Sequence, residues 1–262
     1  MRALHTAATG MMAQELNVQV ISNNIANMRT TGYKRQRVEF QDLLYEHVSR
    51  IGTQTSAQGN RLPVGIDLGG GVKTVGTPRL MTQGTLNQTG GTLDLAIRGD
   101  GFFKVAMPDG TFTYTRDGSF QMDAQGRIVT AQGNVVQPGI TIPPNASAIT
   151  INPQGQVSVT LPGSTTPTVL GQFTLTRFTN PAGLAAIGDN LFTETVASGT
   201  AQDGLPSADS YGDLQQSNLE QANVQAVTEI SDLIAAQRAY EMNSKVITAA
   251  DQMLQSTSNL MR

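Results

Sequence analysis

Hydrophobic residues near the start of the chain recur at alternating intervals of three and four. The positions that share this spacing are Leu4, Ala7, Met11, Gln14, Val18, Ile21, Ile25 and Met28. Such spacing draws an apolar seam along one side of a helix, broken only at Gln14. A helix of ~25 residues is about 38 Å long, and its seam requires a covering partner.

The other end of the chain carries a second periodic line that repeats every seven residues. Its members are Leu219, Ala226, Leu233, Tyr240, Ile247, Leu254 and Met261. Ala222, Ala236 and Ala250 run beside this line and are small enough for close helix approach, while Val246, Met253 and Leu260 widen the stripe. The pattern predicts that the final ~45 residues form a long helix.

Between these ends the period changes from seven to two. Alternating apolar residues predict short strands near Leu93–Ile97, Phe103–Met107, Phe112–Tyr114, Phe120–Met122, Ile149–Ile151, Val157–Leu161 and Phe173–Leu175. Glycines at 110, 118, 126, 133 and 155 close predicted turns, because glycine adopts the positive φ that hairpins often need. We therefore expect an antiparallel meander or barrel.

Two polar segments without an apolar face separate the helical and strand regions. The first runs from Gly52 to Pro63 and the second from Ala197 to Tyr211. The glycine run at 69–71 predicts an extended or sharply bent chain at the entry to the strand region.

Composition narrows the class of protein. The 262 residues have 14% charged residues, a net charge of −3 and no cysteine. These values argue against polyanion binding, a disulfide framework and a cysteine-ligated metal. The segment from Ile128 to Thr176 has no charged side chain, which favours surfaces that meet neighbouring protein. We expect no transmembrane span and no Sec signal peptide.

The sequence motifs predict no catalytic, metal or cofactor site. His5 and His47 lie in no metal-binding spacing, and no glycine motif for nucleotides is complete. Asp109 and Asp117 precede turn glycines, so turn chemistry explains them better than glycoside hydrolysis does. Gly-x-Ser-x-Gly is absent, which leaves an esterase nucleophile without support.

Two polar groups leave alternatives open. The basic cluster of Lys34, Arg35 and Arg37 is read as a solvated face, with an acidic partner surface as the alternative. Three asparagines stand near the end of the first predicted helix, at Asn23, Asn24 and Asn27. They either terminate that helix or make polar contacts between subunits.

Several of these segments resemble the bacterial flagellar rod and hook protein family. Residues 22–34 read SNNIANMRTTGYK, and residues 237–245 read QRAYEMNSK, followed by DQML at 251–254. In the middle, DLAIRGDGFF at 94–103 and YTRDGSF at 114–120 are similar to the strand domain of that family. FQDLLY at 40–45 and the polar segment up to Pro63 resemble the members that build the distal rod. The likeness therefore extends over essentially the whole chain.

The resemblance implies an α+β subunit with three parts. Residues 1–32 and 215–262 would form a coiled-coil-like inner-tube domain of long terminal helices, and residues 33–75 with 200–214 an extended connector. Residues 76–199 would form an outer, antiparallel all-β domain. The implied partners are copies of itself, other rod proteins, the hook protein, the surrounding ring proteins and the type III export apparatus. The implied place is the basal body, from the periplasm to the outer membrane, with no cofactor.

The expected contact residues follow from the two seams and from the resemblance. The helical contacts are Leu4, Met11, Val18, Ile21, Asn23, Asn24, Ile25, Asn27, Met28, Leu233, Tyr240, Asn243, Ile247 and Leu254. The connector contacts are Gly52, Gln54, Gln58, Gly59, Arg61 and Pro63. We expect a structural subunit that polymerises into a straight, torque-transmitting rod. A hook or other rod protein is the near alternative, and a secreted carbohydrate-binding or glycan-cleaving β-protein the distant one.

Overall fold

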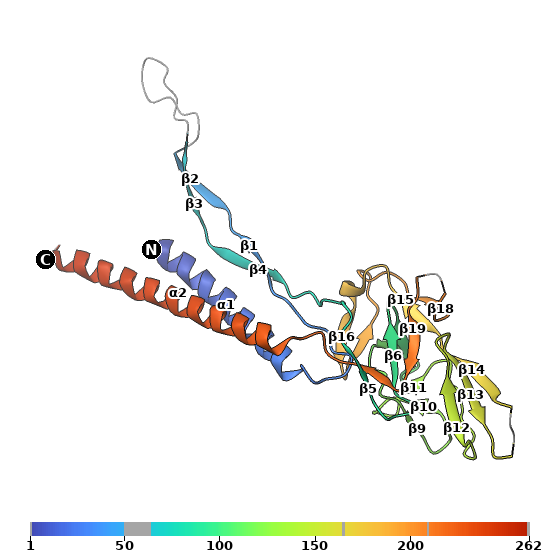
Figure 1. The fold of residues 1–262 in the computed structure, drawn as a ribbon. Coiled ribbons are helices and arrows are strands. Elements are labelled where there is room, and N and C mark those ends of the chain that lie inside the picture. Colours follow the sequence, from blue (N-terminus) through green and yellow to red (C-terminus); the bar gives the residue numbers. More distant parts are fainter. Residues whose placement is uncertain (1, 50–63, 164–165, 209, 261–262) are drawn as a thin grey trace. The chain divides into compact units, whose positions relative to one another are not determined.

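The computed structural model describes residues 2–49, 64–163, 166–208 and 210–260 (Figure 1). Two long helices, α1 (Arg2–Ala26) and α2 (Ala226–Leu260), flank the strands. The strands are β1 (Glu39–Asp42), β2 (Tyr45–Ser49), β3 (Ile66–Gly69), β4 (Val72–Gly76), β5 (Leu86–Gln88), β6 (Leu95–Arg98), β7 (Phe102–Ala106), β8 (Phe112–Thr115), β9 (Gln121–Met122), β10 (Ile128–Val129), β11 (Val135–Val136), β12 (Ala148–Ile151), β13 (Gln156–Thr160), β14 (Thr168–Gln172), β15 (Leu175–Arg177), β16 (Ala185–Gly188), β17 (Leu191–Thr193), β18 (Gln202–Gly204), β19 (Asp213–Gln216) and β20 (Asn218–Glu220). One 3-10 turn, η1, spans Pro181–Gly183.

The chain divides into two compact units. Unit 1 comprises residues 1–25, 36–78 and 226–262, and unit 2 comprises residues 26–35 and 79–225. Helices at both ends and a central antiparallel β-rich region make this an α+β protein.

Unit 1 contains the two helices and a two-stranded ribbon, which we call the arm (residues 39–49 and 66–76). β1 pairs with β4 and β2 with β3, both antiparallel. The backbone bonds from Leu43 N to Gly71 O (2.8 Å) and from Gly70 N to Leu44 O (3.2 Å) make the two pairs continuous. A two-stranded ribbon is marginally stable alone in water, so the arm depends on contacts with other elements.

One of those contacts is a close approach to α1 at Gly71. Its φ of +115° is rare for residues with a side chain, and an added Cβ would collide with Thr9 Oγ1. Thr9 Oγ1 also accepts a bond from Val72 N at 3.4 Å. Glycine at this position therefore lets the arm lie directly on α1.

Unit 2 is built around a nine-stranded antiparallel sheet. Its main path runs β16-β17-β8-β7-β11-β10-β9, with β15 joined to β7 and to β18. A three-stranded sheet β12-β13-β14 and the pairs β19-β6 and β20-β5 complete it.

The larger core cluster of unit 2 is Leu95, Ile97, Phe103, Val105, Phe120, Ile128, Val136, Ile140, Ile142, Ile151, Val157, Val159, Phe173, Leu175 and Leu214. Phe103 meets Phe120 edge to face, with ring centroids 4.9 Å apart. Large apolar side chains thus interdigitate here without help from disulfides.

The structure corrects the predicted start of the C-terminal helix. α2 begins at Ala226, and the preceding residues form β19 and β20 instead. β19 pairs with β6 and buries Leu214 in the core, while Leu219 lies in β20 opposite Asn87. Long-range strand pairing overrides the seven-residue pattern at this point. Within the second polar segment, β18 pairs with β15 in unit 2.

Four of the five predicted turn glycines have a positive φ, namely Gly110, Gly126, Gly133 and Gly155. The fifth, Gly118, does not, so its predicted role is wrong. A Cβ there would collide with the backbone oxygen of Leu95, and Leu95 N bonds to Gly118 O at 3.0 Å. Glycine is needed at 118 because two backbone segments meet, not because the chain turns.

Candidate assembly surface

The two helices of unit 1 run antiparallel and meet through small or polar side chains. On α1, the buried residues are Ala7, Ala13, Val20, Ile21 and Asn24. On α2 the buried positions are Glu229, Ala236 and Ala250, in the register of the small alanines noted in the sequence. Gly10 faces Asn243, whose Nδ2 would lie 2.8 Å from a Cβ at position 10. The helices therefore approach closely along their small residues.

The larger apolar side chains of α2 stay exposed. Ala236 is 3% exposed, whereas Tyr240 and Leu254 on the predicted seven-residue line are 43% and 46% exposed. The large exposed apolar residues of α2 are Val227, Ile230, Ile234, Tyr240, Met242, Val246, Met253 and Leu254. In the part of α2 that the structure describes, the small side chains are buried inside the chain, while these eight exposed residues, which we call the outward stripe, are spread over the rest of the helix surface.

The other predicted contact residues fall into three groups. Leu4, Met11, Val18, Ile25, Asn27, Leu233, Asn243 and Ile247 are half-buried, Ile21 and Asn24 are buried, and Asn23 and Met28 are exposed. The predicted connector contacts Gly52, Gln54, Gln58, Gly59, Arg61 and Pro63 lie outside the described residues.

Asn24 ties together three segments of unit 1. Its Nδ2 donates to Gln36 O (2.9 Å) and to Glu229 Oε2 (3.2 Å), and its Oδ1 accepts from Gln36 N (3.0 Å). Asn24 and Glu229 are both fully buried. The side chain of Asn24 thus joins the end of α1 to the start of α2, a role that neither of the two predicted alternatives described.

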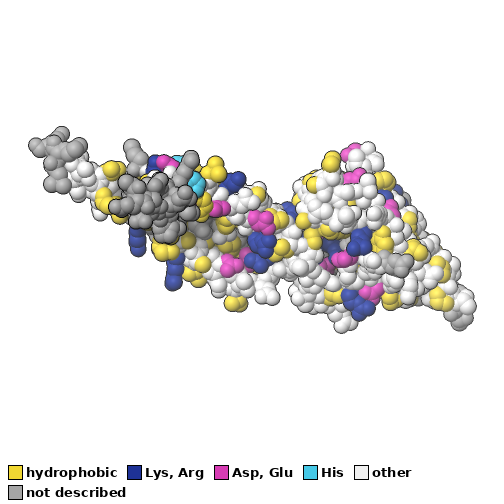
Figure 2. Space-filling model, turned by 90° about the horizontal axis from the view of Figure 1, so that it is seen from above, with side chains coloured by type: hydrophobic (Ala, Val, Ile, Leu, Met, Phe, Trp, Pro, Cys, Tyr) yellow, Lys and Arg dark blue, Asp and Glu magenta, His cyan; other side chains and the backbone are white. Residues whose placement is uncertain are grey.

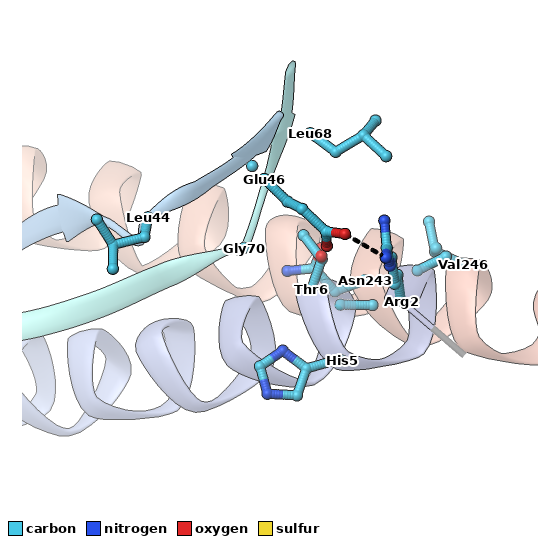
Figure 3. A pocket seen from close by; sticks show the side chains of 12 residues that line it. Arg2, His5, Thr6, Leu44, Glu46, Leu68, Gly70, Asn243 and Val246 are labelled. Carbon is cyan, nitrogen blue, oxygen red and sulfur yellow. Dashed lines mark hydrogen bonds and ion pairs between the residues drawn. The ribbon is translucent and has the colours of Figure 1, made fainter. Parts of the chain in front are cut away.

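A groove lies where the arm passes the N-terminal part of α1. Its volume is about 640 Å³, and it is lined by Arg2, Ala3, His5, Thr6, Ala7, Leu44, Glu46, Leu68, Gly69, Gly70, Asn243 and Val246. Figure 3 shows Arg2 and Glu46 reaching toward one another across it, with Nη2 and Oε1 2.7 Å apart. Both partners of this ion pair are well exposed, so it contributes little to stability.

Unit 2 holds a buried cluster of charges that the sequence did not predict. Lys34 Nζ lies 2.6 Å from Glu220 Oε1, with the two side chains 1% and 0% exposed. Lys34 also donates to Thr82 O at 2.9 Å, and Gly84 N donates to Glu220 Oε1 at 2.9 Å. Arg116 Nη1 is 3.6 Å from Glu220 Oε2. The prediction of a solvated face is therefore wrong for Lys34, because its ammonium group is buried against Glu220, which is far away in the sequence.

Burial controls the protonation equilibria of this cluster. Desolvation lowers the pKa of Lys34 below its ordinary value, although the adjacent Glu220 carboxylate opposes the shift. Desolvation also lowers the pKa of Arg116, again against the attraction of Glu220. The cluster thus joins the strand β20 to the segment around Lys34 at a high desolvation cost.

The Thr30–Lys34 segment is fixed by further contacts within unit 2. Asn190 Nδ2 donates to Thr31 O at 3.0 Å, and Gly32 N donates to Glu220 O at 2.8 Å. Gly32 has a φ of +69°, and a Cβ there would lie 2.7 Å from Asp117 N. Thr31, Gly32 and Lys34, at the end of the signature at 22–34, therefore hold this segment against other parts of unit 2.

Neither a metal-binding cluster nor a helix that could span a membrane is found among the described residues. Among them, no group of three or more histidine or acidic side chains is arranged to hold a metal ion. His47 Nδ1 lies 2.6 Å from Asp67 Oδ1 across the arm, where both residues are exposed. No helix in the described ranges has the length and apolarity to cross a bilayer. Figure 2 shows a largely uncharged surface with separate hydrophobic patches.

Comparison with known proteins identifies the group to which the chain belongs. Residues 4–34 match the family described as flagella basal body rod protein, and residues 215–260 match the flagellar basal body rod FlgEFG protein C-terminal family. Residues 96–159 match the flagellar hook protein FlgE/F/G D1 domain.

Full-length relatives agree with these matches. The chain is 56% identical to the flagellar basal-body rod protein FlgG of Caulobacter vibrioides, over 99% of both chains. It is 47% identical to FlgG of Borreliella burgdorferi, over 100% of this chain and 99% of the relative. The chain belongs to the flagellar basal-body rod family. It is a structural subunit of the distal rod, located in the flagellar basal body. An account of its assembly must say what covers the exposed apolar residues of α2.

Proposed function

We propose that this chain polymerises with copies of itself into a straight helical rod, held mainly by the outward stripe of α2. The observation that carries the proposal is the contrast on α2 between buried alanines and exposed large apolar side chains. An isolated subunit would leave that stripe in water, and a second subunit would cover it.

The size of the stripe favours several neighbours for each subunit. Full burial of one large apolar side chain contributes ~1.5–3 kcal/mol, and these eight are already partly covered. At about half that value each, the gross gain is about 6–12 kcal/mol. Association costs ~4–15 kcal/mol, so a single contact roughly breaks even. A helical polymer, in which each subunit meets several others, tips the balance toward assembly.

The arrangement within the rod follows from the family. We place α1 and α2 in the inner tube as coiled-coil-like packed helices, with residues 33–75 as the connector and residues 76–199 outside. The predicted helical range 215–262 is narrowed to α2, because residues 213–220 form β19 and β20. The neighbours along and around the rod would be other rod proteins, the hook protein and the ring proteins. Export through the type III apparatus, and a location from the periplasm to the outer membrane, complete the proposal.

In this proposal the subunit acts mechanically and has no catalytic role. Torque from the motor to the hook crosses many repeated interfaces, so stiff packing matters more than a chemical site. The low proportion of charged residues, 14%, limits the desolvation cost of burying such surfaces.

The connector also has a proposed role. We expect Gly52 to Pro63 to bridge neighbouring subunits and to keep the rod straight, because the segment is polar and lacks an apolar face of its own. Deleting it should give flexible or curved polymers under the electron microscope. Straight polymers from the deletion variant would rule this role out.

The main proposal is tested by polymerisation of a variant that carries Ile234→Ser and Tyr240→Ser. Both side chains are exposed, so the monomer should keep its helical content while polymers disappear from sedimentation and electron microscopy. Val196→Ser, at a fully exposed position of unit 2, is the matched control and should polymerise like the unmodified chain. Polymers of ordinary length from the double variant would contradict the proposal.

A further inference from the structure

The end of α2 extends beyond the partner helix in its own chain. Asn24 meets Glu229 and Gly10 faces Asn243, so equal steps along both helices define one antiparallel register. Continued to Arg2, that register ends level with Asp251. The segment Gln252–Leu260, which we call the overhang, therefore has no described residue of α1 beside it. At 1.5 Å per residue it is about 13 Å long.

The overhang is suited to burial against protein. It contains no charged residue, and its side chains at Met253 and Leu254 are 63% and 46% exposed. Two of its hydroxyls are already bonded within the helix, from Ser256 to Gln252 O at 2.9 Å and from Thr257 to Met253 O at 2.8 Å. Covering this segment would thus remove apolar surface from water without leaving those hydroxyls unsatisfied.

The groove between the arm and α1 has the complementary properties. Leu44, Leu68 and Val246 border it, and their side chains are 92%, 44% and 47% exposed. Its charged groups Arg2 and Glu46 neutralise each other at 2.7 Å (Figure 3). A volume of about 640 Å³ is within the ~300–1,000 Å³ range of pockets that enclose a ligand. The groove therefore accepts a neutral, partly apolar segment more readily than a charged one.

The overhang cannot occupy the groove of its own chain. α2 is one continuous helix from Ala226 to Leu260, and its residues Asn243 and Val246 already line that groove. Because the helix continues without a break in its described residues, Met253 lies farther along the helix axis than the groove and does not turn back to it. The complementary surface must then belong to another molecule.

We propose that the overhang of one copy docks in the groove of a second copy. This is a head-to-tail contact that rests on the proposed polymerisation. Such a heterologous contact joins different surfaces of two identical subunits, so it propagates along a filament rather than closing a dimer. Leu44, Leu68 and Val246 of one copy cover Met253 and Leu254 of the next.

Disulfide trapping tests the contact directly, because the chain has no cysteine of its own. Leu68→Cys and Met253→Cys are placed in separate molecules, which are mixed, polymerised and oxidised. We expect a covalent heterodimer in the polymer and at least about tenfold less in dilute monomer, since trapping follows effective concentration. Leu68→Cys mixed with Val227→Cys is the matched control, because Val227 is 80% exposed at the opposite end of α2 and should not be trapped.

Each outcome separates this contact from polymerisation itself. Polymers without the 68–253 heterodimer would overturn the docking and leave the proposed function standing. Equal trapping at 227 would show that another part of α2 occupies the groove, which also overturns the proposal. Failure of the unmodified chain to polymerise would overturn both.

A second variant tests the apolar character of the contact without oxidation. Met253→Asp should raise the concentration needed for polymerisation by about tenfold, and Met253→Leu should restore it, because only the aspartate brings a charge into the groove. Equal polymerisation of all three chains would contradict the proposal.

Discussion

Replacing Lys34 by methionine should destabilise unit 2 strongly. The substitution keeps an apolar stem of similar length and removes the ammonium group that lies 2.6 Å from Glu220. Glu220 then stays buried with a hydrogen bond from Gly84 N at 2.9 Å and Arg116 at 3.6 Å. Removing one partner of a buried ion pair costs ~3–5 kcal/mol. The remaining Arg116 places the expected value near the lower end, at about 3 kcal/mol.

The measurement is urea unfolding followed by the near-ultraviolet circular dichroism of the aromatic cluster. Phe102, Tyr114 and Phe178 pack edge to face in unit 2, so their signal reports this unit. A loss of about 3 kcal/mol should also lower the melting temperature by about 6–12 °C, at ~2–4 °C per kcal/mol for a unit of this size.

Arg98→Met is the matched control. Arg98 forms an ion pair with Asp213 at 2.6 Å, but its side chain is 62% exposed, so its loss should destabilise unit 2 far less than the loss of Lys34. Combining Lys34→Met with Glu220→Gln should cost less than the sum of the two single changes, because each removes the charge that the other leaves unpaired. If Lys34→Met cost no more than Arg98→Met, the buried pair would not stabilise unit 2 as argued.

Three further changes have defined outcomes. Asn24→Ala should cost unit 1 about 2–4 kcal/mol in urea unfolding, because it leaves buried partners unsatisfied, whereas Ala at the exposed Gln19 should be near neutral. Gly71→Ala should make the arm susceptible to proteolysis, because its φ is +115° and Thr9 blocks a Cβ, while Gly76→Ala, with open space around it, should not. Burial raises the pKa of Asp203, but hydrogen bonds from Lys104 and Thr176 outweigh burial, so this pKa lies below its ordinary value of 3.8. Asp203→Asn should therefore lower the stability at neutral pH, and its difference from the unmodified chain should fade as the pH falls below about 3.8.

The sequence predicted the helices and most core strands because each carries a regular apolar period. The three- and four-residue spacing from Leu4 to Met28 matches α1 (Arg2–Ala26), and the alternation at 103–107 matches β7. Elsewhere, hydrogen-bonded pairing between strands that are distant in the sequence determined the secondary structure. Residues 213–220 continue an apolar pattern into α2, yet they form β19 and β20 because β6 and β5 offer partners.

The sequence could not show which apolar stripe each helix keeps for itself. α2 carries a large line through Leu233 and Tyr240 and a small line through Ala236 and Ala250, and both repeat every seven residues. α1 lies beside the small line, where Gly10 faces Asn243, so the small line is buried while Leu233 and Ile247 on the large line are half-buried. Periodicity identifies faces, whereas side-chain size decides which face meets which neighbour.

The buried ion pair lay beyond sequence reasoning for a different reason. Lys34 stands beside Arg35 and Arg37 in a basic run that is typical of a solvated face, and its partner Glu220 is 186 residues away. Glu220 itself lies in the short strand β20, whose sequence has no pattern that marks it as buried. Such pairs depend on two distant segments meeting, which a local pattern cannot encode.

The internal placement of these charges explains how a subunit can present neutral surfaces to its copies. Unit 2 uses Lys34, Glu220 and Arg116 to tie strand β20 to the segment that follows α1. Lys34 donates to Glu220 and to Thr82 O, and Arg116 donates to Gly99 O. The overhang of α2 carries apolar, amide and hydroxyl side chains instead, with no charge on any of its faces. A charge on those faces would have to be desolvated again in every subunit of a filament, and the cost would scale with its length. Charges are therefore tolerated where the chain itself pairs them, as Arg2 and Glu46 are paired in the groove, and the overhang carries none.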